Sequence, residues 1–164
     1  MNLKRIILGI LATSGMALGL VGNNQASANK QLKSAPVSIR GTWYHFYGKY
    51  YGTRAHMNKM VIGKHSLTEY SNGHTYYYKG SKFGVDQYRE TIRYNGYKKH
   101  YYYFHHLVTF GDTPAYAPAH MKVAGKYRHV LLESPQQGPT PIYTRFKPSK
   151  VYQISGHYLG SYFY

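Results

Sequence analysis

The chain has 164 residues and a formal charge of +16, because 21 lysines and arginines are set against only 5 acidic residues. It contains no cysteine, which excludes disulfides, a thiol nucleophile and a lipid-modified cysteine anchor. Tyrosine contributes 21 residues, and this favours strands because the phenol ring suits a half-buried pleated surface.

The first 28 residues have the three parts of a secretory signal peptide. Lys4 and Arg5 precede an apolar stretch over 6–21, and a small-residue site with Ala26 and Ala28 follows. The apolar stretch contains glycines and is short for a bilayer span, so a retained anchor is the weaker alternative. We expect this signal helix to be cleaved after Ala28. Cleavage would leave 136 residues, a length that suits one domain, with a formal charge of +14.

Residues 29–36 are predicted to form a flexible lead-in, followed by one β domain over 37–164. Glycine, proline and asparagine punctuate this domain about every ten residues, as expected for short strands. The predicted strands are 37–47, 57–62, 66–70, 74–79, 88–94, 97–106, 120–124, 126–133, 142–146, 151–154 and 158–163. We expect an all-β fold, a single antiparallel meander barrel of about eight short strands, because closure removes exposed edges. A two-sheet sandwich is the alternative.

The clearest local unit is a hairpin around Asn95-Gly96, a pair that favours a two-residue turn. An uninterrupted register places Arg93 opposite Lys98, with one face of the hairpin basic and aromatic. Like charges in that position are unfavourable unless an anion bridges them, although both side chains could instead extend into screened solvent. The predicted anion- or polymer-binding residues are Arg89, Arg93, Lys98, His100 and Tyr102.

Two runs of tyrosine, 76–78 and 101–103, place rings on both faces of their strands. One interpretation assigns these rings to the core on one side and to ordinary strand surface on the other. The alternative is that exposed rings stack on the sugar rings of a glycan or on an apolar polymer.

Gly41-Thr42-Trp43 resembles the G-x-W motif of the lipocalin-like (calycin) barrels. In that superfamily the tryptophan closes one end of the barrel, and a basic residue from a late strand packs across it. Arg145 occupies the matching late position, and a guanidinium over an indole ring would form a cation–π contact. The resemblance therefore implies a structural role in barrel closure for Gly41, Trp43 and Arg145. The export signal, this Gly-Thr-Trp-Tyr start and the tyrosine-rich basic strands also resemble small exported proteins of lactic-acid bacteria.

No enzymatic motif marks the few acidic residues, which are Glu69, Asp86, Glu90, Asp112 and Glu133. Glycosidase chemistry needs two positioned carboxylates, and no spacing in this chain identifies such a pair. The ten histidines lack the spacing of a zinc site, and no glycine-rich phosphate loop is present. We therefore predict no catalytic residue, no metal site and no cofactor.

These features together predict a secreted, cationic, tyrosine-rich protein that associates non-covalently with the cell envelope. Its partners would be an anionic wall polymer or glycan, or an anionic membrane surface, because charge would hold an exported basic protein there. Nucleic acid is not expected as a partner, given the export signal. The alternative is a lipocalin-like carrier of a small apolar ligand in the barrel interior. The oligomeric state is left open.

Overall fold

A computed structural model describes residues 29–49, 54–94, 97–105, 114–134 and 139–154, apart from the side chains of 89–99. The predicted signal helix with its cleavage site at Ala26 and Ala28, and the predicted strand 158–163, lie outside the described residues. No helical segment among the described residues has the length and apolarity needed to cross a bilayer.

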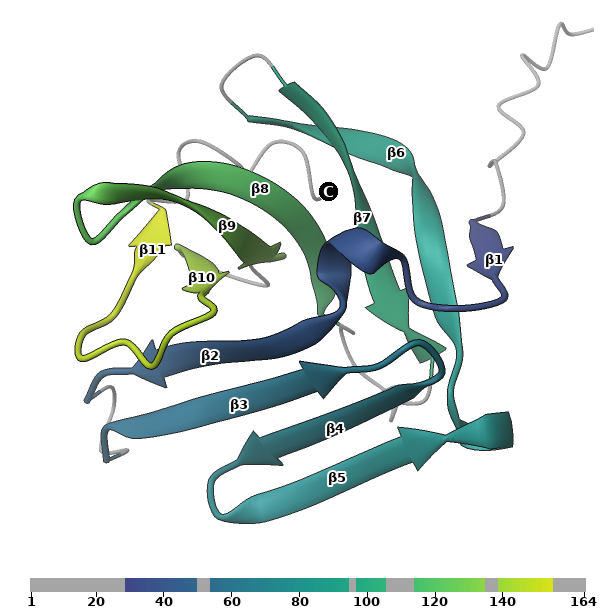
Figure 1. The fold of residues 1–164 in the computed structure, drawn as a ribbon, viewed down its shortest axis with the longest axis horizontal. Coiled ribbons are helices and arrows are strands. Elements are labelled where there is room, and N and C mark those ends of the chain that lie inside the picture. Colours follow the sequence, from purple (N-terminus) through teal and green to yellow (C-terminus); the bar gives the residue numbers. More distant parts are fainter. Residues whose placement is uncertain (1–28, 50–53, 95–96, 106–113, 135–138, 155–164) are drawn as a thin grey trace, which may run out of the picture.

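The described chain is all-β and forms two antiparallel sheets (Figure 1). The larger sheet has the order β1-β6-β7-β8-β9-β10-β11, and the smaller has the order β2-β3-β4-β5. The larger sheet comprises β1 (Lys30–Leu32), β6 (Val85–Tyr94), β7 (Tyr97–Phe104), β8 (Ala115–Val123), β9 (Lys126–Glu133), β10 (Thr140–Tyr143) and β11 (Gln153–Ile154). The smaller comprises β2 (Gly41–Tyr47), β3 (His56–Ile62), β4 (Ser66–Ser71) and β5 (His74–Lys79). Two 3₁₀ turns, η1 (Val37–Ile39) and η2 (Gly80–Lys82), precede β2 and β6.

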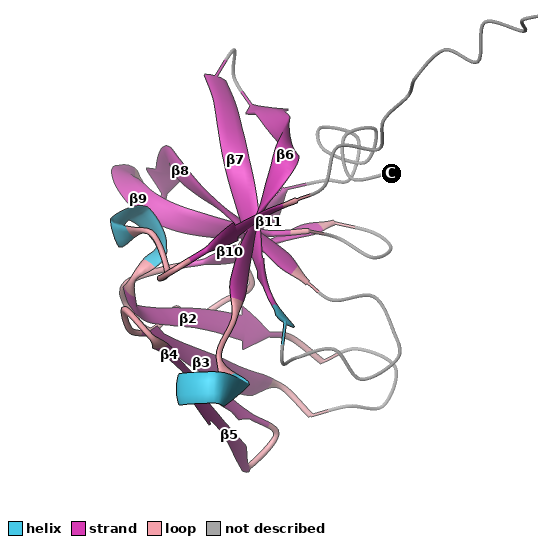
Figure 2. Ribbon diagram, turned by 90° about the vertical axis from the view of Figure 1, so that its right-hand side faces the viewer, coloured by secondary structure: helices cyan, strands magenta, loops and turns pink. Residues whose placement is uncertain are grey.

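The main core lies between the two sheets, which Figure 2 shows one above the other. Alternate residues of β2, β3 and β4 point into it, as the period of a half-buried strand requires. The larger sheet contributes alternate residues of β7, β8 and β9. The fully buried large side chains of this core are Ile39, Trp43, Met60, Ile62, Leu67, Phe104, Tyr116 and Leu131.

The predicted closed barrel is not found among the described residues. The sheets are joined at one edge by a single antiparallel bridge between Tyr44 of β2 and Thr144, whose reciprocal N–O distances are both 2.8 Å. At the other edge of the smaller sheet, β5 pairs with β4 alone in the described part of the chain. The observed arrangement is therefore two sheets that meet at one corner. It is closer to the two-sheet alternative than to the predicted barrel.

Two further expectations differ from the structure. Residues 29–36 were expected to be a flexible lead-in, but β1 pairs with β6 and Ala35 is buried, with its N–H donated to Lys64 O at 3.0 Å. The predicted strands leave 107–119 unassigned, yet 115–119 belong to β8. Proline lacks a backbone N–H, and β8 tolerates Pro118 because β8 pairs with β7 only at Ala115 and Tyr116. The edge of β8 that faces β7 therefore needs no hydrogen-bond donor at Pro118.

Asn72-Gly73 adopts the turn conformation that an Asn-Gly pair favours between two strands. Asn72 has φ 50° and Gly73 has φ 77°, so both central residues are left-handed, as a two-residue hairpin turn requires. Ala124 and Gly125 connect β8 to β9 in the same conformation, with φ 51° and 76°. Alanine gives no sequence signal for that turn, since it rarely adopts positive φ.

Candidate functional site

The basic hairpin face is only partly as predicted. The backbone register does place Arg93 opposite Lys98 and Thr91 opposite His100. A register shift between Gln87 and Thr91 then brings Gln87, rather than Arg89, opposite Tyr102. The bulged segment of β6 therefore breaks the uninterrupted pairing on which the face was predicted.

Tyr102 itself does not lie on an exposed face. It is 9% exposed and packs in the core between the sheets, whereas His100 on the same strand is exposed. The side chains of Arg89, Arg93 and Lys98 lie outside the described residues. The structure thus keeps His100 at the surface and removes Tyr102 from the predicted site.

The contact implied by the calycin resemblance is present. The Arg145 Cζ lies 3.4 Å from the centroid of the Trp43 ring, and Trp43 Nε1 donates to Ile39 O at 2.7 Å. Arg145 Nη2 also donates to Arg40 O at 2.5 Å, which fixes the guanidinium over the indole. Gly41 makes room for this guanidinium, because a Cβ at that position would lie 2.0 Å from Arg145 Nη1. These residues stabilise the corner where the sheets meet rather than closing a barrel.

Replacing Gly41 with alanine should lower the free energy of unfolding by more than the strain of its positive φ accounts for. Gly41 has φ 109°, and a Cβ in that region costs about 1–2 kcal/mol even without a clash. Gly125→Ala is the matched control, because Gly125 has φ 76° and nothing lies within 4 Å of its ideal Cβ. Urea unfolding followed by the fluorescence of the single tryptophan measures both variants. Equal losses would show that the packing of Arg145 over Gly41 carries no stability.

A second surface, not predicted as a unit, covers the solvent side of the smaller sheet. The register pairs Tyr44 with Lys59 and Lys59 with Tyr70, so these side chains share one face, opposite to Trp43 and Met60. The same parity adds the exposed residues Tyr77 and Lys79 of β5. We call this set, Tyr44, Lys59, Tyr70, Tyr77 and Lys79, the outer face.

Cations and rings are already in contact on the outer face. Lys59 Nζ lies 4.6 Å from the ring centroid of Tyr70, and Lys79 Nζ lies 5.5 Å from that of Tyr77. The Tyr77 side chain is 55% exposed, so one ring face remains open to solvent. A ligand with both phosphate and sugar groups would find a cation and an aromatic surface side by side here.

Charge is segregated throughout the described residues. No described lysine or arginine side chain is buried, and none forms an ion pair with a carboxylate. The carboxylates with described side chains are Glu69, Asp86 and Glu133, and none of them is exposed. The described surface therefore presents many exposed cations, whereas the described acids are buried or half-buried.

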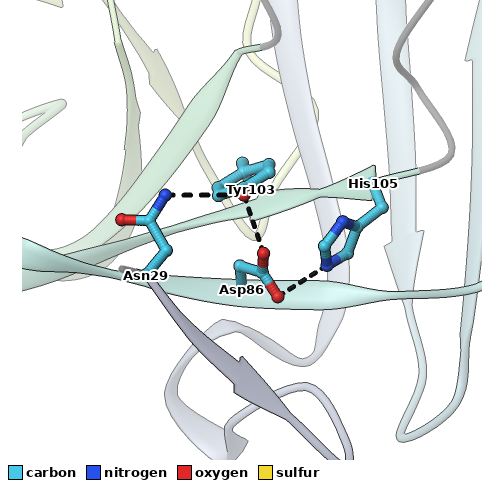
Figure 3. Close-up of polar contacts among 4 residues, drawn as sticks. All are labelled: Asn29, Asp86, Tyr103 and His105. Atoms are coloured by element: carbon cyan, nitrogen blue, oxygen red, sulfur yellow. Dashed lines mark hydrogen bonds and ion pairs between the residues drawn. The ribbon is translucent and has the colours of Figure 1, made fainter. Parts of the chain in front are cut away.

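Asp86 is held inside a polar cluster between β6 and β7 (Figure 3). Tyr103 Oη donates to Asp86 Oδ2 at 2.7 Å, and His105 Nε2 lies 2.5 Å from Asp86 Oδ1. Asn29 Nδ2 reaches the Tyr103 hydroxyl at 3.5 Å from the segment just before β1. The contacts of Asp86 join β6 to Tyr103 of β7 and to His105 just after β7, and Asn29 connects the segment before β1 to the same cluster.

The other two carboxylates line one cavity of about 380 Å³ between the sheets. Glu69 belongs to β4 and shares the inward face with Met60, while Glu133 ends β9 opposite Tyr116. The cavity volume is within the range of small-molecule sites. Its lining residues are Tyr47, Asn58, Glu69, Pro114, Tyr116, Glu133, Ser134, Pro139, Pro141 and Tyr143.

Burial dominates the electrostatics of this cavity. It raises the pKa of Glu133 to about 7, and the negative charge of Glu69 contributes to the same increase. Hydrogen bonds from Tyr143 and Tyr116 to Glu133 act in the opposite direction and lower that pKa. Burial also raises the pKa of Glu69, and it raises the pKa of Tyr47 to about 12. A carboxyl group that titrates near neutral pH inside a cavity is a common property of binding and catalytic sites.

Asn58 adds an unpaired acceptor to the cavity lining. Its Oδ1 atom is buried without a hydrogen-bond partner, and the residue is 9% exposed. An acceptor left unpaired in this way costs about 1–3 kcal/mol.

Sequence reasoning treated the five acids as unrelated, whereas the fold brings Glu69 and Glu133 together from strands in different sheets. Only a correct pairing of both sheets could have revealed this, since no local motif surrounds either residue. Within the described residues, no group of three or more histidine or acidic side chains is placed to hold a metal ion. Comparison of the chain with protein-family models, with curated proteins and with solved structures finds no match.

Proposed function

We propose that the protein is exported and binds anionic polymers of the cell envelope through the outer face. The observation that carries this proposal is the combination of Tyr70, Tyr77, Lys59 and Lys79 on one solvent-facing sheet surface with no described carboxylate among them. Lysines would contact phosphate or carboxylate groups of the polymer, and the tyrosine rings would pack on its sugars. The proposed site thus lies on β3, β4 and β5, and not on the hairpin of β6 and β7.

The overall charge supports the same proposal. A surface of one sign attracts polyanions over several ångströms and concentrates them near the protein, and added salt weakens that attraction. A formal charge of +14 after cleavage at Ala28 would be large for a chain of this size. Repeating polymers would use many such weak contacts at once, which increases their total affinity.

An apolar ligand in the interior finds less support. Core side chains such as Trp43, Met60 and Phe104 fill the space between the sheets outside the described cavity. The described cavity carries Glu69, Glu133 and Asn58 in its lining, and burying an apolar ligand against such groups would cost their hydration. We therefore do not propose a lipocalin-like carrier.

Cell-wall sedimentation tests the outer face. The mature protein should bind purified walls that carry teichoic acid at least about tenfold more tightly than walls stripped of it. Raising NaCl from about 0.05 to 0.5 M should release most of the bound protein, because the Debye length shrinks severalfold. The double variant Lys59→Gln/Lys79→Gln should lose most of this binding at low salt.

Lys122→Gln/Lys126→Gln is the matched control, since it removes the same charge from exposed positions on β8 and β9. It should bind walls within about twofold of the unaltered protein. Equal losses in the two double variants would show that net charge, and not the outer face, determines binding. Retention at high salt would contradict an electrostatic tether altogether.

A further inference from the structure

An open hollow lies at the end of β5, where the chain runs into η2 (Figure 1). It has a volume of about 460 Å³, and its described lining residues are Tyr77, Lys79, Gly80, Ser81 and Lys82. All five are exposed, so a ligand can reach each of them from solvent. We call it the β5–η2 hollow. Its volume suits one phosphate group together with one sugar or polyol unit.

The β5–η2 hollow is positively charged. Lys79 and Lys82 both line it, and none of its described lining residues is acidic. Neither lysine forms an ion pair within the described part of the chain. Two ammonium groups beside one hollow repel each other, and an anion placed between them offsets that repulsion and accepts a charge-assisted hydrogen bond from each. The hollow therefore favours an anion over a neutral or cationic ligand.

Gly80 leaves the backbone between the two lysines uncovered. Its φ of 57° lies in the left-handed region that favours glycine, and no atom lies within 4 Å of the position that a Cβ would take. Ser81 follows Gly80 and is also exposed, so its hydroxyl can donate a third hydrogen bond. Three side-chain donors around one hollow suit the tetrahedral oxygens of a phosphate group better than the two coplanar oxygens of a carboxylate.

Tyr77 gives the β5–η2 hollow an aromatic wall. Its side chain is 55% exposed, and the Lys79 Nζ lies 5.5 Å from the centroid of its ring. A cation and an accessible ring are therefore adjacent. The C–H groups of a sugar or polyol can pack on the ring while the attached phosphate contacts the lysine. The hollow thus combines the two contacts that a sugar or polyol phosphate needs.

We propose that the β5–η2 hollow binds one phosphodiester-linked sugar or polyol unit of an envelope polymer. This inference rests on the proposed function, and it narrows the ligand from anionic polymers in general to polymers that carry phosphate. Lys79 and Lys82 contact the phosphate, Ser81 donates to one of its oxygens, and Tyr77 packs on the attached carbon unit. Tyr77 and Lys79 belong to the outer face, and Lys82 is the cation that the inference adds to it.

Titration of the mature chain with glycerophosphoglycerol, followed by the chemical shifts of the backbone amides, tests the hollow. This probe is a phosphodiester with one negative charge between two polyol units. It should bind saturably, with a dissociation constant on the order of 1–10 mM, because it has few atoms and its contacts are exposed. The largest shifts should fall on residues 77–82. Glucuronate, a sugar with one carboxylate and the same charge, should bind at least about fivefold more weakly.

Variants separate the hollow from general electrostatics. Lys82→Gln should weaken glycerophosphoglycerol binding by about threefold or more, since it removes one of the two charges beside the phosphate. Lys126→Gln is the matched control, because it removes the same charge from an exposed position on β9. It should change the affinity less than about 1.5-fold, because solvent and salt screen distant charges.

The role of the aromatic wall has its own variant. Tyr77→Ser should weaken glycerophosphoglycerol binding by about threefold, because the polyol loses the ring on which it packs. The same variant should bind inorganic phosphate within about 1.5-fold of the unaltered protein, since that probe has no carbon unit. Tyr77, Lys82 and Lys126 are all exposed, so their replacement should leave the fold intact.

Three results would overturn the inference. They are equal affinity for glucuronate and glycerophosphoglycerol, equal losses in Lys82→Gln and Lys126→Gln, and shifts that fall outside residues 77–82. Wall binding without a preference for the phosphodiester would leave the proposed function standing while this inference fails. Binding of the phosphodiester in the hollow by a protein that does not sediment with walls would show the reverse.

Discussion

Replacing Trp43 with alanine should lower the free energy of unfolding by about 3–5 kcal/mol, the largest effect expected for any single substitution in this chain. The Trp43 ring is 0% exposed and belongs to the main core. Its removal leaves a cavity and takes the donor away from Ile39 O. It also leaves the Arg145 guanidinium without the aromatic surface on which it packs. Urea unfolding followed by far-ultraviolet circular dichroism measures this loss.

Tyr127→Ala is the control for the loss of an aromatic ring outside the core. Tyr127 lies on β9 with its side chain 82% exposed, so its replacement should change stability by less than about 0.5 kcal/mol. Trp43→Phe should fall between the two, because it keeps an aromatic ring but removes the indole N–H. If Trp43→Ala cost less than about 1 kcal/mol, the corner between the two sheets would not be a main source of stability.

Glu133→Gln should make the protein more stable at pH 8, by about 1–3 kcal/mol. The folded protein has a pKa of about 7 for Glu133, compared with an ordinary value of 4.5. Between these two values the folded state binds the proton more tightly than the unfolded state. Stability contributed by this group therefore falls as the pH rises from about 4.5 to 7, and the loss persists above 7. Glutamine avoids that loss because it stays neutral and keeps an acceptor oxygen for Tyr116 and Tyr143.

Urea unfolding of both proteins at pH 4, 6 and 8 tests this expectation. The difference between them should be near zero at pH 4 and should grow towards pH 8. The histidines titrate equally in both proteins, so they cancel from the difference. Glu69→Gln should shift stability in the same direction, since burial also raises the pKa of Glu69. A glutamine variant that is less stable than the unaltered protein at pH 8 would contradict the buried position of Glu133.

Local pattern predicted the strands well where alternation and turn residues agreed. The predicted strands 57–62, 66–70, 74–79 and 126–133 match β3, β4, β5 and β9 within one residue at each end. These segments pair with sequence neighbours, so hairpin chemistry such as Asn72-Gly73 is sufficient to define them. The contact of Arg145 with Trp43 is also observed, although it was expected from the calycin resemblance and not from local pattern.

Long-range pairing was harder to predict. The bulge in β6 between Gln87 and Thr91 shifts every pair beyond it, and a bulge has no fixed sequence signature. The expected closure is not observed because β6 pairs with β1 and β7, which leaves β5 paired with β4 alone in the described chain, and strand propensity does not reveal such a choice of neighbours. The cavity with Glu69 and Glu133 depends on both sheets at once. It was therefore beyond reach of an interpretation that treats each strand separately.

The inward orientation of the acids has a consequence for how copies of this protein behave together. When two copies approach through their described surfaces, exposed lysines face one another, and none of the described carboxylates is fully exposed to pair with them. Free protein is thereby kept dispersed by its own repulsion. Once a polyanion neutralises that repulsion, copies can crowd along it at separations of about one Debye length, roughly 8 Å in physiological salt. On a polymer of the kind proposed above, dense coating would therefore depend on the polymer as well as on the protein.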